Sequence, residues 1–146
     1  MKQNQNIMKP NPPIITNNPT NAPLPFLIEP YIQSICLHLK INVQHIEVTL
    51  LPIKEIQQMN LEYFKKNTPT DTISFNLTPE EAITGDIYIN LDTIQTNAMQ
   101  YKQPLEKELK LVLIHSILHL IGFTDDTTEA IKKMTDKQTM LLQLLP

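Results

Sequence analysis

The sequence contains very little glycine and no arginine. Its 146 residues include only two glycines, Gly85 and Gly122, against twelve prolines, and all twelve basic residues are lysines. Because glycine fits backbone conformations and close contacts that other residues cannot, we expect each of the two to occupy such a position. Tryptophan is absent and Cys36 is the single cysteine. One cysteine excludes a disulfide-stapled fold and a cysteine-based zinc finger, and it is typical of a reducing cytoplasm.

Long apolar runs and net positive charge are also missing. No run approaches the roughly 20 residues that span a bilayer, and the first residues, MKQNQNIMKPNPP, lack the apolar core of a secretory signal. We therefore expect no membrane partner and a cytoplasmic location. The formal net charge is −3, whereas proteins that grip nucleic acid through bulk electrostatics are usually basic. Any contact with RNA must therefore be local or depend on a partner that delivers the RNA.

Length and composition indicate one folded domain. A chain of this length is the size of a single domain, and a hydrophobic fraction of 41% suffices for a core. Residues 1–25 hold six of the twelve prolines and six asparagines. Residues 1–12 are therefore predicted to form a flexible leader, and residues 13–146 the domain. Within that N-terminal stretch, the β-branched residues 14–16 could add an edge strand.

Hydrophobic periodicity predicts strands and helices along the rest of the chain. A period of two predicts strands at residues 46–51, 71–77 and 85–90, and helical spacing predicts helices at 29–39, from Pro52 onward, at 91–100, at 105–121 and after Asp126. The helix at 105–121 is apolar almost all round beyond its first turn, so it is predicted to be buried and central. The fold class is therefore α/β (α+β).

The feature that points to chemistry lies on this central helix. His115 and His119 are four residues apart, so both imidazoles project from one face and can reach one ion at about 2.0–2.1 Å. Gly122 can adopt the left-handed conformation that lets the chain fold back, and Asp125 can then complete the site. Two nitrogens and one carboxylate leave a fourth position open, as in catalytic zinc sites. We predict one Zn²⁺ per chain, held by His115, His119 and Asp125, with Gly122 as the structural turn.

The spacing of the histidine pair also occurs in core histidines and in zinc peptidases. If both histidines were core residues, each would need a hydrogen-bond partner. Burying an imidazole without a partner on so aliphatic a helix would destabilise the fold. Zinc peptidases carry H-E-x-x-H, in which the glutamate is the general base. Here that position is Ser116, a neutral hydroxyl with no visible activator. Peptidase activity is therefore the least favoured hypothesis.

Three blocks of sequence resemble the patterns of one family. Residues 115–125, HSILHLIGFTD, are similar to H-G-x-L-H-L-x-G-[YF]-D-H. Residues 60–75, NLEYFKKNTPTDTISF, are similar to N-x-x-Y-R-x-K-D-x-P-T-[DN]-V-L-S-F, and residues 85–87 match a G-D-[IL] strand. In this order and spacing, the chain resembles the YbeY family of bacterial endoribonucleases over roughly residues 13–146.

The resemblance implies a small mixed sheet flanked by helices, with zinc bound to the helix of the first block. It also implies hydrolysis of single-stranded RNA, in 16S rRNA 3′-end maturation and ribosome quality control. The small ribosomal subunit is then a partner, and no DNA substrate is expected. Zinc would stabilise charge at the phosphate or activate a water molecule. The attacking group is either that water or the RNA 2′-hydroxyl, and no residue is assigned as the general base.

This sequence departs from the family pattern at two important positions. The third ligand is histidine in most relatives and Asp125 here. Asp126 is a neighbour that could substitute for it, but Asp126 is better placed to cap the last helix. The arginine of the second block, proposed in the family to act on the phosphate, is Phe64 here. Lys65 and Lys66 beside it either contact RNA phosphates or form a solvated turn. A zinc-binding ribosome-assembly factor with weak or no cleavage activity is therefore the alternative function.

Residues near the second block have open roles as well. Asp71 and Ser74 either line a substrate groove or hold the preceding turn through hydrogen bonds. Tyr63 and Phe75 could stack on bases, although core packing is favoured for Phe75.

Overall fold

The computed structural model describes residues 13–78 and 82–146, so the leader predicted at residues 1–12 lies outside the described part of the chain. In that part, helices and strands follow the order that the sequence predicts. Their bounds are β1 (Ile14–Asn17), α1 (Ile28–Leu39), β2 (Val43–Leu50), α2 (Ile53–Phe64), β3 (Thr72–Asn76), β4 (Ile83–Ile89), α3 (Leu91–Gln100), α4 (Leu105–Leu120) and α5 (Thr128–Leu144). None of these helices is long and apolar enough to cross a membrane.

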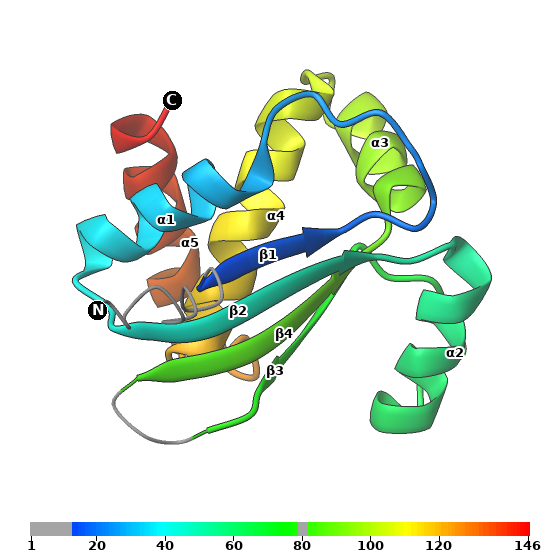
Figure 1. Cartoon of the computed structure of the whole chain (residues 1–146). Helices are drawn as coiled ribbons and strands as arrows, with labels where there is room; N and C mark the ends of the chain where they lie inside the picture. The colour runs from blue at the N-terminus through cyan, green and yellow to red at the C-terminus, as the bar shows by residue number, and fades with distance from the viewer. Residues whose placement is uncertain (1–12, 79–81) are drawn as a thin grey trace, which may run out of the picture.

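The described strands form one mixed sheet with the order β1–β2–β4–β3 (Figure 1). β1, β2 and β4 run parallel, and β3 pairs antiparallel with β4 at one edge. β1 forms the other edge, where Ile14 lies opposite Ile46 of β2. Both the edge strand expected at residues 14–16 and the small mixed sheet flanked by helices are confirmed.

Helix α4 is the central helix of the fold. Figure 1 shows α1, α4 and α5 together on one side of the sheet, and α4 contacts α1, α3, α5, β3 and β4. Leu109, Leu113 and Ile117 of α4 are almost completely buried. Burying one such side chain stabilises the fold by about 1.5–3 kcal/mol. The tight packing of α4 therefore fixes the positions of the side chains that it carries. The predicted buried central helix is confirmed.

Gly85 lies in β4 where Leu120, at the end of α4, packs against the sheet. A Cβ atom at this position would lie 2.9 Å from both terminal methyl carbons of Leu120 and 3.2 Å from the carbonyl oxygen of Phe75. Any larger side chain would therefore force the buried side chain of Leu120 to repack and would crowd the carbonyl of Phe75. The close approach that we expect at one of the two glycines is found here.

Two strands begin earlier than their own sequence patterns indicate. β2 begins at Val43 rather than at residue 46, and β4 begins at Ile83 rather than at residue 85. The added residues pair with each other, with Val43 opposite Ile83 and an irregularity in the register before His45. Pairing with a distant strand thus extends each strand beyond its own alternation of apolar residues.

The start of the last helix differs from the prediction. The side chain of Thr127, and not that of Asp126, caps α5 by accepting a hydrogen bond from the N–H of Ala130 at 3.0 Å. Asp126 instead accepts a hydrogen bond from the hydroxyl of Thr124 at 2.8 Å. Aspartate and threonine are both good N-cap residues. The hydrogen bond from Thr124 holds Asp126 in the loop, and Thr127 therefore serves as the N-cap of α5.

Helix α2 lies apart from the other helices (Figure 1). Thr72 and Asn76 of β3 form hydrogen bonds with α4, so Phe75 projects from the opposite face of the sheet. On that face, the rings of Tyr63 and Phe64 lie with their centroids 5.1 Å and 6.2 Å from that of Phe75. The end of α2 therefore covers β3 on the side that α4 leaves open.

Candidate metal centre

The chain turns back on itself at the end of α4. The N–H of Gly122 donates to the carbonyl of His119 at 3.1 Å, and the N–H of Phe123 donates to that of Leu118 at 3.0 Å. This pair of bonds is the Schellman arrangement, which ends a helix with a residue at positive φ. Gly122 has φ +105°, a conformation that favours glycine. The chain leaves this turn in the direction that brings Asp125 back towards α4.

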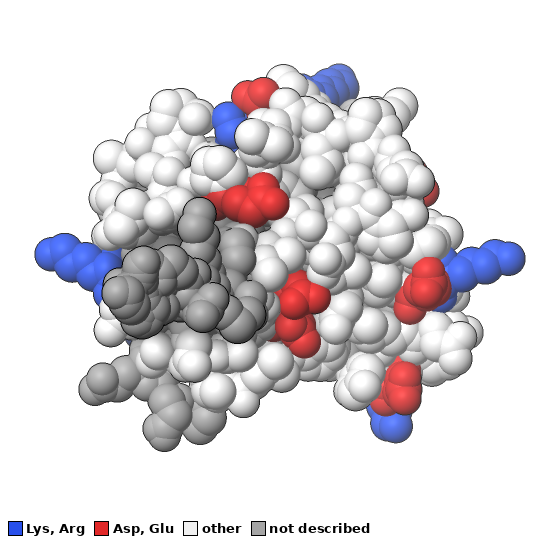
Figure 2. Space-filling view, viewed as in Figure 1, with Lys and Arg blue, Asp and Glu red and all other residues white. Residues whose placement is uncertain are grey.

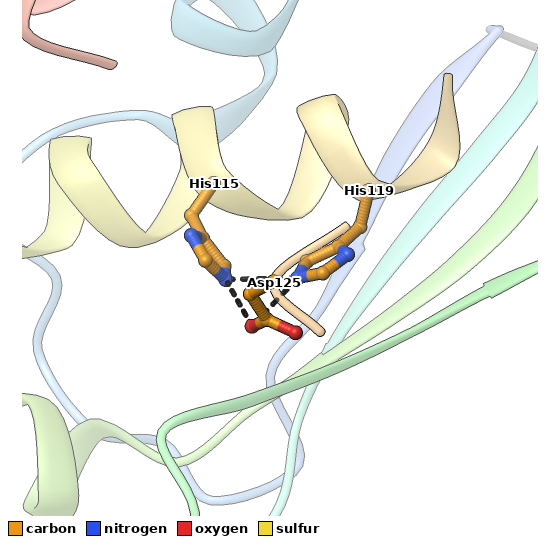
Figure 3. Close-up of side chains that lie close together, drawn as sticks. All are labelled: His115, His119 and Asp125. Atoms are coloured by element: carbon orange, nitrogen blue, oxygen red, sulfur yellow. Dashed lines mark hydrogen bonds and ion pairs between the residues drawn. The ribbon is translucent and has the colours of Figure 1, made fainter. Parts of the chain in front are cut away.

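Three side chains converge beside this turn, and we call them the metal centre. Figure 3 shows His115 and His119 projecting from one side of α4, with Asp125 approaching them from the following loop. The Nε2 atoms of the two histidines are 2.9 Å apart. The Oδ2 atom of Asp125 lies 3.6 Å from Nε2 of His119 and 4.0 Å from Nε2 of His115. The imidazoles are 30% exposed and the carboxylate 58% exposed, so the group is open to solvent on one side.

The spacing of these atoms fits a tetrahedral zinc ion. Zinc binds imidazole nitrogen and carboxylate oxygen at about 2.0–2.2 Å, so two of its ligand atoms lie about 3.3–3.5 Å apart. The observed separations of 2.9, 3.6 and 4.0 Å bracket that value, and small side-chain rotations would equalise them. Three protein ligands also leave the fourth position open. The donor set therefore fits zinc, and the role of the three residues as its ligands stays a prediction.

The surroundings of His119 favour the form that binds a metal. Burial of the ring, and then the neighbouring His115, lower the pKa of His119 below its usual value, while Asp125 acts in the opposite direction. A protonated imidazole has no lone pair to offer a metal. The lowered pKa therefore keeps His119 neutral and able to act as a ligand near neutral pH.

Gln138 of α5 supports His115, although none of the sequence motifs includes it. The side-chain oxygen of Gln138 hydrogen-bonds with Nδ1 of His115. Because an amide oxygen only accepts, Nδ1 donates and Nε2 keeps its lone pair for a metal. A signal for this role was present in the sequence. Met134 and Leu141 are buried on α5, and Gln138 is a polar residue on the same helix face.

A pocket of about 400 Å³ lies in front of the metal centre. Of the two lysines predicted as phosphate contacts, Lys66 lines this pocket. Lys65 ends α2 at φ +61° and is not part of the lining. Phe64, which stands where the family pattern has arginine, does line the pocket. The structure thus places one of the two lysines, together with the aromatic ring that replaces the family arginine, beside the metal centre.

Asp71 and Ser74 also line the pocket. The turn before them is held by other side chains: the amide of Asn60 donates to the carbonyl of Thr68 at 3.0 Å. Of the two roles left open by the sequence, the geometry therefore favours a place in the groove for Asp71, whereas the hydroxyl of Ser74 is buried and has no hydrogen-bond partner among the described residues.

Ser116 takes no part in the pocket. Its side chain is fully buried and donates to the carbonyl of Val112 at 2.8 Å, and its Oγ lies 2.8 Å from Oγ1 of Thr72. A peptidase of the H-E-x-x-H type has its general base at this position. A buried hydroxyl that is hydrogen-bonded to both Val112 and Thr72 cannot serve as that base. The geometry therefore counts against peptidase activity.

The sequence matches one family model along most of its length. The model described as endoribonuclease YbeY matches residues 17–146, a range that contains the whole metal centre. The chain belongs to the YbeY family. Its resemblance to the family, first inferred from three short blocks, is thereby confirmed. A curated YbeY endoribonuclease from Chloroherpeton thalassium is 40% identical over 106 residues, which are 73% of this chain and 75% of that protein.

Other YbeY relatives agree with this assignment. The YbeY endoribonuclease of Chlorobium phaeobacteroides is 39% identical over 90 residues, which are 62% of this chain and 63% of the relative, under two thirds of its length. Among solved structures, the solution structure of TM1509 from Thermotoga maritima matches with a TM-score of 0.59 and 28% identity. That match covers 90% of this chain and 88% of the other, so the fold is shared along nearly the whole chain.

The charged side chains on the face drawn in Figure 2 form no continuous basic patch. The lysines there stand apart at the periphery, and acidic side chains lie between them. The net charge of −3 agrees with this distribution. Binding of RNA to that face would gain little from long-range attraction.

Proposed function

We propose that this chain is a zinc-dependent endoribonuclease specific for single-stranded RNA. In this proposal it acts in the cytoplasm with the small ribosomal subunit, in 16S rRNA 3′-end maturation and ribosome quality control. One observation carries the proposal: His115, His119 and Asp125 converge at an open pocket, in a chain of the YbeY family. The curated relatives are named endoribonucleases, which supports RNA as the substrate.

Five residues in or next to the pocket have definite tasks in this proposal. His115, His119 and Asp125 hold one zinc ion, which when bound supplies a Lewis acid for the phosphate group. Gln138 fixes the ring of His115. Lys66 provides a positive charge for a neighbouring phosphate, as a point charge without the two-pronged geometry of arginine.

The products identify the attacking group. Attack by the RNA 2′-hydroxyl leaves a 2′,3′-cyclic phosphate, whereas attack by water leaves a linear phosphate. Mass spectrometry of the cleaved ends separates the two routes. Single-stranded DNA of the same sequence serves as the control, because it lacks the 2′-hydroxyl and is not expected to be a substrate.

Zinc content measured together with RNA cleavage tests the proposal. We expect about one zinc per wild-type chain, and loss of both zinc and cleavage in His119→Ala and in Asp125→Ala. Full zinc in Asp125→Ala would show that the third ligand is another residue. Unchanged cleavage in His119→Ala would trace the activity to a contaminating nuclease.

The second candidate function is zinc-dependent ribosome assembly without cleavage. It is favoured by one observation: Phe64 occupies the pocket position of the family arginine, and the chain contains no arginine to replace it. A zinc-loaded protein that binds the small subunit and leaves single-stranded RNA intact would support this candidate over the first. The peptidase alternative would need cleavage of an unfolded protein, which we do not expect.

A further inference from the structure

Half of the tyrosine and phenylalanine side chains of this chain form one cluster, and one member of that cluster lines the pocket of the metal centre. The sequence has four tyrosines and four phenylalanines. Tyr63, Phe64 and Tyr88 surround Phe75 with ring centroids 5.1, 6.2 and 6.1 Å from its own, and we call these four residues the aromatic cluster. They come from α2, β3 and β4, so folding and not sequence proximity brings them together.

Phe64 is the member of the aromatic cluster that lines the pocket. Its side chain is 48% exposed, and its ring plane lies within 14° of that of Phe75. Phe75 therefore backs the ring and restricts its orientation, while the rest of the ring remains accessible. An aromatic surface already held in place loses little conformational entropy when a flat ligand stacks on it.

The charges around the pocket give RNA only weak electrostatic attraction. Among the described residues that line the pocket, Lys66 is the single lysine, and Asp71 and Asp125 carry the opposite charge. Proteins that bind single-stranded nucleic acid combine attraction for the backbone with stacking of bases on aromatic side chains. Where attraction for the backbone is weak, base stacking has to supply more of the affinity.

We propose that Phe64 forms a nucleobase-stacking subsite beside the metal centre. The base of a single-stranded RNA stacks on the exposed part of the Phe64 ring, and Lys66 contacts the attached phosphate. Bases inside a duplex have both faces covered by their neighbours, so this subsite accepts single-stranded and rejects double-stranded RNA. The inference rests on the proposed function for its ligand, and it assigns the strand preference to one residue of this chain.

The absence of tryptophan makes a direct test possible. In Phe64→Trp the new indole is the single tryptophan of the protein, so its fluorescence reports on this subsite alone. We expect the emission to be quenched by a uridine oligoribonucleotide about eight nucleotides long. We expect no quenching by an abasic ribose-phosphate chain of equal length. Tyr101→Trp is the matched control, because Tyr101 is 66% exposed at the end of α3 and does not line the pocket.

Fluorescence anisotropy with the same labelled oligoribonucleotide measures the contribution of Phe64 to binding. Phe64→Ala is expected to weaken binding about tenfold, and Phe64→Tyr to bind like wild type. Phe64→Leu keeps apolar bulk without an aromatic face and is expected to behave like Phe64→Ala. Tyr63→Ala removes another member of the aromatic cluster that does not line the pocket, and it is expected to bind nearly as wild type.

The outcomes separate this inference from the proposed function. Wild-type binding by Phe64→Ala and Phe64→Leu, or equal binding of the abasic chain, would overturn the stacking subsite even if the wild type cleaves RNA. Base-dependent binding through Phe64 in a wild type that cleaves nothing would support the subsite and refute the nuclease. A wild type that neither binds nor cleaves RNA would refute both. Zinc content and thermal unfolding of each variant show that the pocket is intact.

Discussion

The Oγ1 atom of Thr72 in β3 lies 2.8 Å from the Oγ atom of Ser116 in α4. Ser116 is fully buried and gives its hydroxyl proton to the carbonyl of Val112, so Thr72 is the donor of the bond between them. This bond joins the edge strand to the helix of the metal centre, one residue from His115. The family pattern has glycine at position 116, so this chain makes here a connection that glycine cannot.

Removing this bond should weaken the fold and leave the metal centre intact. We expect Ser116→Ala to lower the free energy of unfolding by about 0.5–1 kcal/mol, because the lost hydrogen bonds outweigh the better helix propensity of alanine. In a double-mutant cycle with Thr72→Val, the two changes should be coupled by about 0.5–1.5 kcal/mol. Urea unfolding provides these energies. Additive effects would show that the bond contributes nothing, and loss of zinc would show that it also positions His115.

Gly122→Ala should reduce both stability and zinc affinity. Nothing lies within 4 Å of a Cβ atom at this position, so the penalty comes from φ +105° and not from a clash. We expect a cost of about 1–2 kcal/mol, together with weaker zinc binding, because any relief of the strain moves Asp125. Chelator competition measures the affinity. Gly122→Asn is the control, since asparagine tolerates positive φ better than alanine and should keep more of both properties.

Cys36 should be unreactive in the folded protein. The side chain is 4% exposed, and burial raises the pKa of its thiol to about 11. At pH 7 only about one molecule in ten thousand then carries the nucleophilic thiolate. We expect slow alkylation by iodoacetamide under native conditions and rapid alkylation in guanidinium chloride. Fast reaction of the native protein, followed by mass spectrometry, would show that α1 opens readily.

The parts of the site within one helix and its turn could be predicted from the sequence. His115 and His119 share a face because of helical geometry, and Gly122 marks the end of that helix because few other residues fit there. The apolar pattern of residues 105–121 likewise determines its burial. These inferences depend on near neighbours in the chain, where residue spacing translates directly into position.

The parts that depend on distant segments could not be predicted in this way. Phe64 reaches the pocket because α2 packs on the face of β3 opposite to α4, and no local pattern specifies that packing. The early starts of β2 and β4 result from their pairing with each other. Gln138 contacts His115 across 23 positions of sequence, and its only local sign is a polar residue on the buried face of α5.

Gln138 provides a sharp test of the metal centre because its role is separable from folding. Gln138→Leu removes the acceptor for Nδ1 of His115 and places an apolar residue between the buried Met134 and Leu141. We expect the zinc-free protein to unfold at a similar or higher temperature, and zinc to bind about 10–100-fold more weakly. A merely structural residue would change stability and zinc affinity together.

A conservative variant and an exposed control complete the comparison. Gln138→Glu retains an acceptor for His115 and should restore tight zinc binding, because histidine ligands are commonly oriented by carboxylates. Gln143→Leu alters an exposed glutamine of the same helix and should leave zinc affinity unchanged. In nitrogen NMR spectra of the zinc-free protein, the Nδ1-protonated form of His115 should dominate in wild type and Gln138→Glu, and decline in Gln138→Leu. If Gln138→Leu binds zinc as tightly as wild type, the orientation of His115 is set by α4 alone.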